Sequence, residues 1–204
     1  MDFWYVIIAS VVSYLLGSIP TSVWVGKLFY GVDVREQGSG NAGATNTFRV
    51  LGAKAAIPVF IIDVLKAYVA AKLVVFFPYL PHTPMYINLQ LLFGILAVVG
   101  HIFPIYAGFK GGKGVASLLG VTLAISPISA LLALAVFVVV LLITHCVSLG
   151  SMLAGCSYPL FVFFVEKTDI VSLQVFSVIF AVLLLVTHRK NIARLRNGEE
   201  KKMW

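Results

Sequence analysis

The chain has 204 residues, of which 60% are hydrophobic and only 11% are charged, and its formal net charge is +7. Its mean hydropathy is +1.01. Soluble domains contain about 25% charged residues and roughly half apolar residues, so water cannot be the main solvent of this chain. A soluble globular protein is thereby excluded, and we expect one all-α integral membrane domain over residues 1–204.

Long apolar runs between polar loops predict where the chain crosses the bilayer. A crossing helix needs about 20 residues, at about 1.5 Å per residue. The apolar stretch 117–144 is compatible with one long helix or with two helices divided at Ser126-Pro127, which leaves a choice between six and seven crossings. We expect seven, at residues 3–28, 55–77, 87–107, 113–126, 128–145, 149–165 and 170–187.

The distribution of positive charge favours seven crossings over six. Residues 188–204 contain six Lys and Arg against two Glu, and the loops at 30–54 and 107–117 are also basic. Positively charged segments stay on the cytoplasmic side of a membrane. Seven crossings with the N-terminus outside and the C-terminus inside place all three segments in the cytoplasm, together with nearly every polar motif of the chain.

The first polar motif is VREQGSGNAGATNTFR, residues 34–49. Its glycines have the G-x-G-x-x-G spacing of a dinucleotide loop, but no βαβ unit surrounds them, so a Rossmann site is excluded. Glycines let successive N–H groups point into one concavity that holds an anion, and two arginines flank the loop. The alternative is an interfacial turn that caps the next helix. The candidate phosphate-binding residues are Gly38, Ser39, Gly40, Asn41, Gly43, Thr45 and Asn46, with Arg35 and Arg49 as the flanking charges.

The second motif is YAGFKGGKGVAS, residues 106–117, with four glycines and two lysines in the seven positions 108–114. It lacks the spacing of a Walker A loop, so no ATP site is predicted. A glycine turn that leads into a helix N-terminus favours an anion, and an adjacent lysine strengthens it. Lysines that reach to lipid headgroups would explain the charges but not the glycines. The candidates here are Lys110, Gly111, Gly112, Lys113 and Gly114.

Three smaller features lie elsewhere in the chain. His188 and Asn191 share a helix face in the amphipathic tail THRKNIARLRNGEE, residues 187–200. Ser148 and Ser151 share a face where CVSLGS opens a helix, and they either cap this helix or touch a ligand. Asp63 and Lys66 are three residues apart inside the second crossing, where we expect them to pair with each other or with the first loop.

Several common types of site are missing from the sequence. No histidine has an aspartate five residues later, G-x-S-x-G does not occur, and no cluster of His and carboxylates suits a catalytic metal. We therefore expect no metal, no cofactor and no nucleic-acid site. An enzyme that joins a polar substrate to a lipidic one fits this layout. A phosphate or organic-anion transporter is the alternative, although transporters usually show internal repeats and a polar site at the midplane.

Three motifs together resemble one enzyme family. GSGNAGATN with Arg49, GHIFPIYAGFKGGKGVAS and HRKNIARLRNGEE occur in the order found in the bacterial acyl-phosphate:glycerol-3-phosphate acyltransferases of the PlsY type. LGSIPT, DVLKA and VSLGS also fit, so the resemblance covers nearly the whole chain. The chain differs from the usual family residues at Ala67, Ser117 and His145-Cys146.

This resemblance implies a reaction in the bacterial inner membrane. A fatty acyl group passes from acyl phosphate to the 1-hydroxyl of glycerol 3-phosphate, which gives 1-acylglycerol 3-phosphate (lysophosphatidate) and inorganic phosphate. The resemblance implies no cofactor, contact with membrane lipids, and a functional link to the enzyme that makes acyl phosphate.

The resemblance also implies residue roles. Residues 39–46 would hold one phosphate through backbone N–H groups. Arg49, Lys113, His188 and Asn191 would form the catalytic set around glycerol 3-phosphate, with Ser148 or Ser151 on its hydroxyl. The proton of the attacking hydroxyl would pass to His188 or to a substrate phosphate, and the absence of a His-Asp pair favours the phosphate. Which loop holds which phosphate stays open.

Overall fold

A computed structural model describes residues 3–203, and these residues form helices, turns and loops without a strand. The all-α expectation is therefore confirmed. The chain folds into two compact units, the first ending at Ile125 and the second beginning at Ser126. The prediction of a single functional domain stays a prediction.

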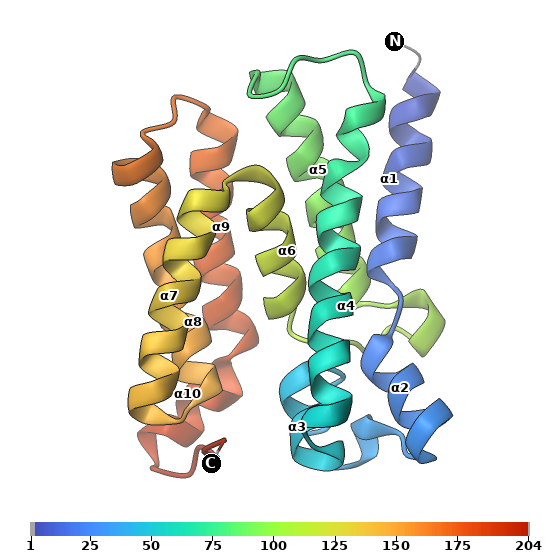
Figure 1. Ribbon diagram of the computed structural model, residues 1–204, viewed down its shortest axis with the longest axis vertical. Coiled ribbons are helices and arrows are strands. Elements are labelled where there is room, and N and C mark those ends of the chain that lie inside the picture. Colours follow the sequence, from blue (N-terminus) through green and yellow to red (C-terminus); the bar gives the residue numbers. More distant parts are fainter. Residues whose placement is uncertain (1–2, 204) are drawn as a thin grey trace. The chain divides into compact units, whose positions relative to one another are not determined.

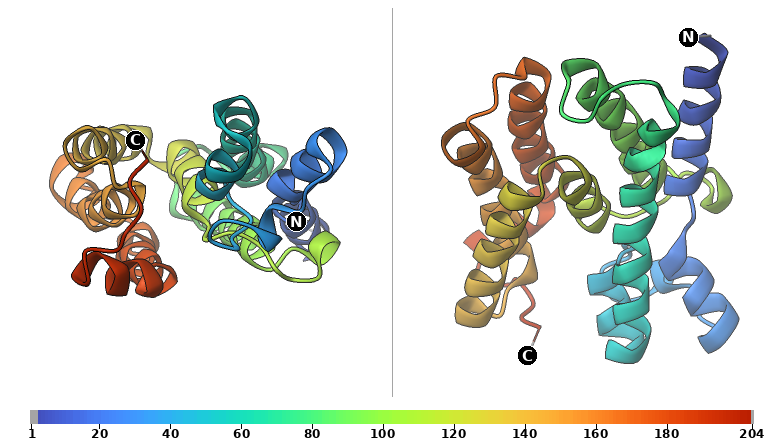
Figure 2. Two further views of the ribbon diagram at one scale, coloured as in Figure 1. Left: turned by 90° about the horizontal axis from the view of Figure 1, so that it is seen from below. Right: turned by 45° about the horizontal axis from the view of Figure 1, so that its top comes forward.

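The first unit is a helical bundle (Figure 1). In this view the segments 31–43 and 103–114 lie in its lower part, and the connection between α4 and α5 lies at its upper end. In the bundle, α4 packs on α6 and α5, and α1 packs on α5. The segment between α5 and α6 runs beside α2, where the ring centroids of Trp24 and Tyr106 are 6.2 Å apart (Figure 2, left). The elements are α1 (Phe3–Gly17), α2 (Thr21–Tyr30), η1 (Val34–Glu36), α3 (Ala44–Leu51), α4 (Ala53–Lys72), η2 (Leu73–Phe76), α5 (Pro84–Ile102), η3 (Ile105–Ala107) and α6 (Val115–Ile125).

The predicted single helix over 3–28 is wrong, because the chain bends there. Helix α1 ends at Gly17 and α2 begins at Thr21, and the two axes differ by 43°. Pro20 stands at the break, where it lacks an N–H group and disfavours helical backbone in the residue before it. Helix α2 lies at the same end of the unit as α3 (Figure 1).

Glycines let the helices of the first unit approach closely. A Cβ atom on Gly17 would collide with the backbone of Ala97, and one on Gly120 would collide with the carbonyl of Val64. Small residues at such crossings are typical of helix packing in membranes, where dispersion contacts rather than the hydrophobic effect hold helices together. The close packing fixes α5 and α6, whose ends carry the second motif.

The second unit contains α7 (Pro127–Thr144), α8 (Val147–Phe161), the π-helical segment η4 (Val162–Glu166), α9 (Val171–Thr187) and α10 (Arg189–Arg196). Helix α8 packs on both α7 and α9. The hydroxyls of Ser126 and Tyr158 form a buried hydrogen bond. Because α6 ends at Ile125 and α7 begins at Pro127, the prediction of two helices rather than one over 117–144 is confirmed.

Helix length and composition identify between three and five candidate membrane crossings in the described residues. Three helical segments in the described residues are long and apolar enough to cross, at Pro84–Ala107, Pro127–Thr144 and Val147–Glu166. Counting the bent pairs α1–α2 and α9–α10 as one span each raises the number to five. Helix α6 has only 11 residues. The count of seven therefore stays a prediction.

Candidate functional site

Two polar clusters stand out, one in each unit. In the first unit, the loop of residues 31–43 (loop 1) lies against the loop of residues 103–114 (loop 2). Arg35 Nη1 donates a hydrogen bond to the Ala107 carbonyl at 2.8 Å. The Ala42 carbonyl oxygen lies 3.0 Å from the position that a Cβ atom of Gly112 would take. The structure thus brings together the two loops that the sequence singled out as phosphate sites.

Arg35 is held by a carboxylate that sequence analysis missed. Asp33 accepts from Arg35 Nε at 3.0 Å and from Nη2 at 2.7 Å, and Lys27 lies 3.1 Å from the same carboxylate. The hydrogen bonds from Arg35 hold the pKa of the Asp33 carboxyl well below its usual range, despite an opposing effect of burial. The two hydrogen bonds to Asp33 orient the guanidinium so that its third nitrogen, Nη1, reaches the Ala107 carbonyl of loop 2.

Loop 1 is built around the side chain of Asn46. Its Oδ1 accepts from the Ser39 N–H at 2.7 Å and from Ser39 Oγ at 3.1 Å. Its Nδ2 donates to the carbonyls of Val34 at 2.6 Å and Gln37 at 3.1 Å. Asn46 is only 2% exposed. These four hydrogen bonds use the full capacity of an amide, so Asn46 and Ser39 hold the loop together in this structure.

A second candidate anion site lies where loop 1 leads into α3, at the first backbone N–H groups of this helix. The N–H groups of Ala44 and Thr45 open this helix, and within residues 3–203 they have no hydrogen-bond acceptor. Gly43 precedes them in an extended conformation, while Gly38 has a φ of 64° that favours glycine. Arg49 is half-buried on the same helix. A helix N-terminus of this kind attracts anions, and both N–H groups belong to the range 39–46 for which backbone binding of a phosphate was predicted.

Loop 2 is fastened to the C-terminal end of α5. The Gly111 N–H donates to the Ile102 carbonyl and the Gly112 N–H to the His101 carbonyl, both at 3.1 Å. A Cβ atom on Gly111 would collide with the His101 carbonyl. Steric crowding therefore explains why glycine occupies this position, without any role in phosphate binding. Lys110 is exposed, and Lys113 is half-buried two positions before Val115, the first residue of α6.

The second cluster converges on Glu200, which the sequence did not mark as a site residue. Its Oε1 accepts from Ser148 Oγ at 2.8 Å and from Asn191 Nδ2 at 2.6 Å. Its Oε2 accepts from Arg194 Nε at 2.7 Å. Burial raises the pKa of this carboxyl, but the hydrogen bonds from Arg194, Asn191 and Ser148 outweigh it and leave the pKa below its usual range. Glu200 therefore ties together α8, α10 and the segment after α10.

His188 and Ser151 are buried, and in the sequence they lie close to Asn191 and Ser148 of this cluster. Their hydrogen-bond partners are backbone carbonyls rather than Glu200. His188 Nδ1 lies 2.8 Å from the Leu184 carbonyl, which can only accept, so Nδ1 carries the proton. In the neutral ring Nε2 is then an acceptor. Ser151 Oγ donates to the Val147 carbonyl of its own helix at 2.8 Å. Neither Ser148 nor Ser151 caps α8, since the N-cap is Cys146 without a side-chain cap bond.

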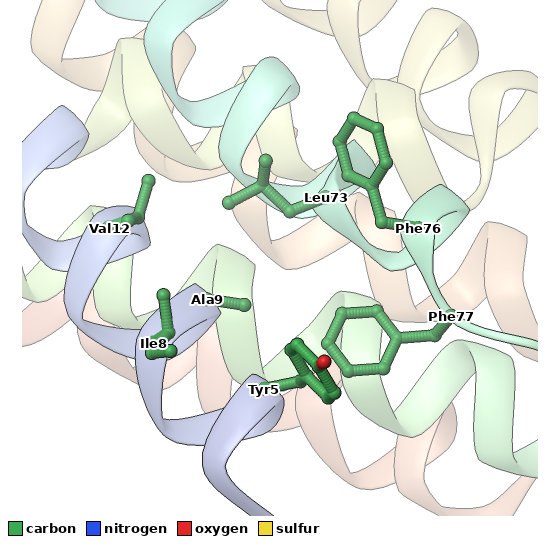
Figure 3. Close-up of a pocket in the computed structure, with 7 residues that line it drawn as sticks. All are labelled: Tyr5, Ile8, Ala9, Val12, Leu73, Phe76 and Phe77. Carbon is green, nitrogen blue, oxygen red and sulfur yellow. The ribbon is translucent and has the colours of Figure 1, made fainter. Parts of the chain in front are cut away.

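An apolar groove of about 220 Å³ lies between α1 and the segment that follows α4 (Figure 3). It is lined by side chains of α1 and of the segment that follows α4, namely Tyr5, Ile8, Ala9, Val12, Leu73, Phe76 and Phe77. It has almost no polar surface, so it has no groups that could bind a phosphate. No group of three metal-ligating side chains occurs in residues 3–203.

The family model for glycerol-3-phosphate acyltransferase matches residues 7–198 of the chain. This range includes both loops and nearly all of the tail motif. The chain belongs to the glycerol-3-phosphate acyltransferase family. Among curated family members, it is 42% identical to the glycerol-3-phosphate acyltransferase of Chlorobaculum tepidum, over 95% of this chain and 94% of that one. It is 44% identical to that of Listeria welshimeri, over 97% and 96%.

Solved structures agree with this family assignment. The crystal structure of PlsY, an integral membrane glycerol 3-phosphate acyltransferase, in its glycerol 3-phosphate form superposes with a TM-score of 0.86 at 38% identity, over 97% of this chain and 95% of that chain. The lysophosphatidic acid form gives 0.84 at 37% identity over the same shares. This family member is accordingly an acyltransferase and an all-helical, multi-pass membrane protein.

Proposed function

We propose that this family member transfers a fatty acyl group from acyl phosphate to the 1-hydroxyl of glycerol 3-phosphate. The products are 1-acylglycerol 3-phosphate and inorganic phosphate. The observation that carries the proposal is the meeting of loops 1 and 2 in the first unit. Loop 1 leads into the N-terminus of α3, and loop 2 places Lys113 beside the N-terminus of α6. Both substrates contain a phosphate, so two neighbouring anion sites match what the reaction needs.

The chemistry needs no covalent enzyme intermediate. The hydroxyl oxygen attacks the carbonyl carbon of the acyl phosphate, a new C–O ester bond forms, and the C–O bond to phosphate breaks. Phosphate leaves with the electron pair, and the hydroxyl proton passes to a phosphate oxygen or to His188 Nε2. Binding both substrates in line supplies proximity, and fixed positive charge stabilises the charge that grows on the carbonyl and phosphate oxygens.

Residues of the first unit take the phosphate-binding roles in this proposal. The Ala44 and Thr45 N–H groups at the start of α3, with Arg49 on the same helix, bind one phosphate. Lys113, beside the N-terminus of α6, binds the other, and Lys110 adds long-range attraction from its exposed position. Asn46 and Ser39 take a positioning role, because their hydrogen-bonding groups hold loop 1.

Residues of the second unit take roles at the glycerol hydroxyls. Asn191 and Ser148 are oriented by Glu200, which fixes the direction of their remaining polar atoms. His188 offers Nε2 as a hydrogen-bond acceptor to a substrate hydroxyl. Ser151 is a weaker candidate, since its hydroxyl proton is used within α8.

The test of this function is product formation in a defined bilayer. Purified protein in phospholipid vesicles is incubated with glycerol 3-phosphate and either palmitoyl phosphate or palmitoyl-CoA, and lysophosphatidate is measured. Product from palmitoyl phosphate and not from palmitoyl-CoA is the expected result. Accumulation of phosphate inside the vesicles without lysophosphatidate would instead indicate a transporter.

We further propose seven crossings of the bacterial inner membrane, with the N-terminus outside and the polar loops and C-terminus in the cytoplasm. Positive charge on the loops and tail supports this orientation. Single cysteines at positions 37, 110 and 198, in a chain with Cys146 and Cys156 replaced, should be shielded from an impermeant thiol reagent in intact cells. Position 110 is preferred to the neighbouring Gly111, which has no room for a side chain. Labelling of any of them from outside would contradict this topology.

A further inference from the structure

A buried group of charged and polar side chains lies within the first unit. Asp63 on α4 is 1% exposed, and its Oδ1 lies 2.7 Å from Lys66 Nζ and accepts from Thr21 Oγ1 at 3.0 Å. Lys66 also donates to the Ile19 carbonyl at 2.7 Å. Charges at such a depth are costly and usually functional. The ion pair is already balanced by these contacts, so Asp63 needs no further partner for its charge.

His101, near the end of α5, is nevertheless placed between this ion pair and loop 2. Its Nδ1 lies 3.6 Å from Asp63 Oδ1, and the ring is 6% exposed. The opposite edge of the ring faces loop 2. A Cβ atom on Gly112 would collide with His101 Nε2 and come within 3.0 Å of Cε1. The imidazole therefore fills the space between the Asp63 carboxylate and the Gly112 backbone.

The backbone of the same residue reinforces this contact. The His101 carbonyl accepts from the Gly112 N–H, and the Ile102 carbonyl accepts from the Gly111 N–H. Side chain and main chain at the end of α5 thus fix two successive peptide units directly before Lys113. The Ala42 carbonyl of loop 1 lies on the same face of Gly112 as the imidazole, 3.0 Å from the position that a Cβ atom would take, so the turn is packed against both α5 and loop 1.

We propose that His101 is a positioning residue for Lys113, acting through the Gly111–Gly112 backbone and oriented by Asp63. The inference rests on the proposed function, because it assigns Lys113 to a substrate phosphate. Displacing a catalytic group by about 1 Å can cost roughly a hundredfold in rate, so a rigid support under the turn matters to catalysis. The ring acts through its Nε2 edge, which faces the turn, and its Nδ1 edge serves to orient it.

Two substitutions separate this role from simple charge compensation. In His101→Gln, the amide reaches the place of Nε2 and keeps the support under Gly112. In His101→Asn, the amide reaches the place of Nδ1, keeps the contact with Asp63 and leaves the turn unsupported. His82→Asn is the control, since His82 is an exposed histidine of the same unit.

The experiment uses the full chain in vesicles and measures two quantities. The first is kcat/KM for glycerol 3-phosphate with palmitoyl phosphate as donor. The second is amide hydrogen exchange of the segment 108–114, which reports on the turn without requiring activity. We expect His101→Asn to lose roughly tenfold in kcat/KM and to speed exchange of the turn by a similar factor, while His101→Gln and His82→Asn stay within about threefold.

A double-mutant comparison shows whether the effect runs through Lys113. In a Lys113→Ala background, adding His101→Asn should cost little more activity, because the positioned group is already gone. Full additivity would overturn the proposal, as would a Gln variant worse than the Asn variant or unchanged exchange in His101→Asn. If the wild-type protein makes no lysophosphatidate from palmitoyl phosphate, the proposed function fails, and hydrogen exchange still decides whether His101 holds the turn.

Discussion

Replacing Glu200 by Gln tests the hydrogen-bond cluster of the second unit with almost no change in shape. Glu200 is nearly buried, with 3% of its side chain exposed. In Glu200→Gln the amide oxygen can still accept from Ser148 and Asn191. The amide nitrogen replaces Oε2, however, and faces the Arg194 Nε–H, so two donors oppose each other.

The expected loss follows from the three hydrogen bonds of this carboxylate. A hydrogen bond to a charged group contributes about 1.5–3 kcal/mol, and a neutral one about 0.5–1.5 kcal/mol. The substitution removes the Arg194 bond and weakens the two others to neutral bonds. Because the Arg194 side chain is 35% exposed, water screens its share. A total near 3 kcal/mol results, which is roughly a hundredfold in the opening equilibrium of residues 197–203.

Hydrogen exchange of the segment 197–203 measures this opening directly. Glu199→Gln is the matched control, because Glu199 is its exposed neighbour and the same charge is removed. We expect fast exchange in Glu200→Gln and nearly unchanged exchange in the control, with α8 remaining protected in both. Equal exchange in the two variants would show that net charge, and not the hydrogen bonds of Glu200, holds the tail.

Three further outcomes are expected. Lys113→Ala should lose roughly a hundredfold in kcat/KM, because a desolvated phosphate contact contributes a few kcal/mol. The control Lys72→Ala should lose less than about threefold in the same assay. Comparable losses in the two variants would contradict a specific role for Lys113. Asn46→Leu should speed hydrogen exchange throughout loop 1 by roughly tenfold or more, because it leaves buried donors and acceptors unpaired. Gln37→Ala, which alters an exposed side chain, should leave this exchange unchanged. The pKa of Glu200 is lowered in the folded protein, so this carboxylate contributes its full stabilisation above the ordinary glutamate pKa of 4.5. The stabilisation is lost as the pH falls through the lower folded-state pKa. Hydrogen exchange of the tail should therefore rise in that acid range in the wild type and not in Glu200→Gln.

Local signals in the sequence predicted several features correctly. The Ser126-Pro127 step divides two helices, because proline cannot continue the preceding helix. Asp63 and Lys66 form an ion pair at 2.7 Å, since residues three apart share a helix face. The same reasoning missed the bend before Thr21, although Pro20 was a local signal for it.

Contacts between distant residues were out of reach of this reasoning. Asn46 looked like a phosphate ligand, yet its amide is used by Val34, Gln37 and Ser39, because α3 folds back on loop 1. Glu199 and Glu200 are neighbouring glutamates in a basic tail, and their sequence context does not predict which of them is buried. Only the second meets Ser148, which lies 52 positions earlier in the chain.

The sequence by itself determined that this protein is a helical membrane protein of the glycerol-3-phosphate acyltransferase family, because composition and local motifs depend only on residue type and spacing. The tertiary structure alone decided which polar groups work together. His101 reaches Asp63 and Arg35 reaches Ala107 only because segments separated by tens of residues in the chain pack within contact distance. Hydrogen bonds and ion pairs act over a few ångströms, and the distance between two side chains far apart in sequence is set by the packing of the whole bundle.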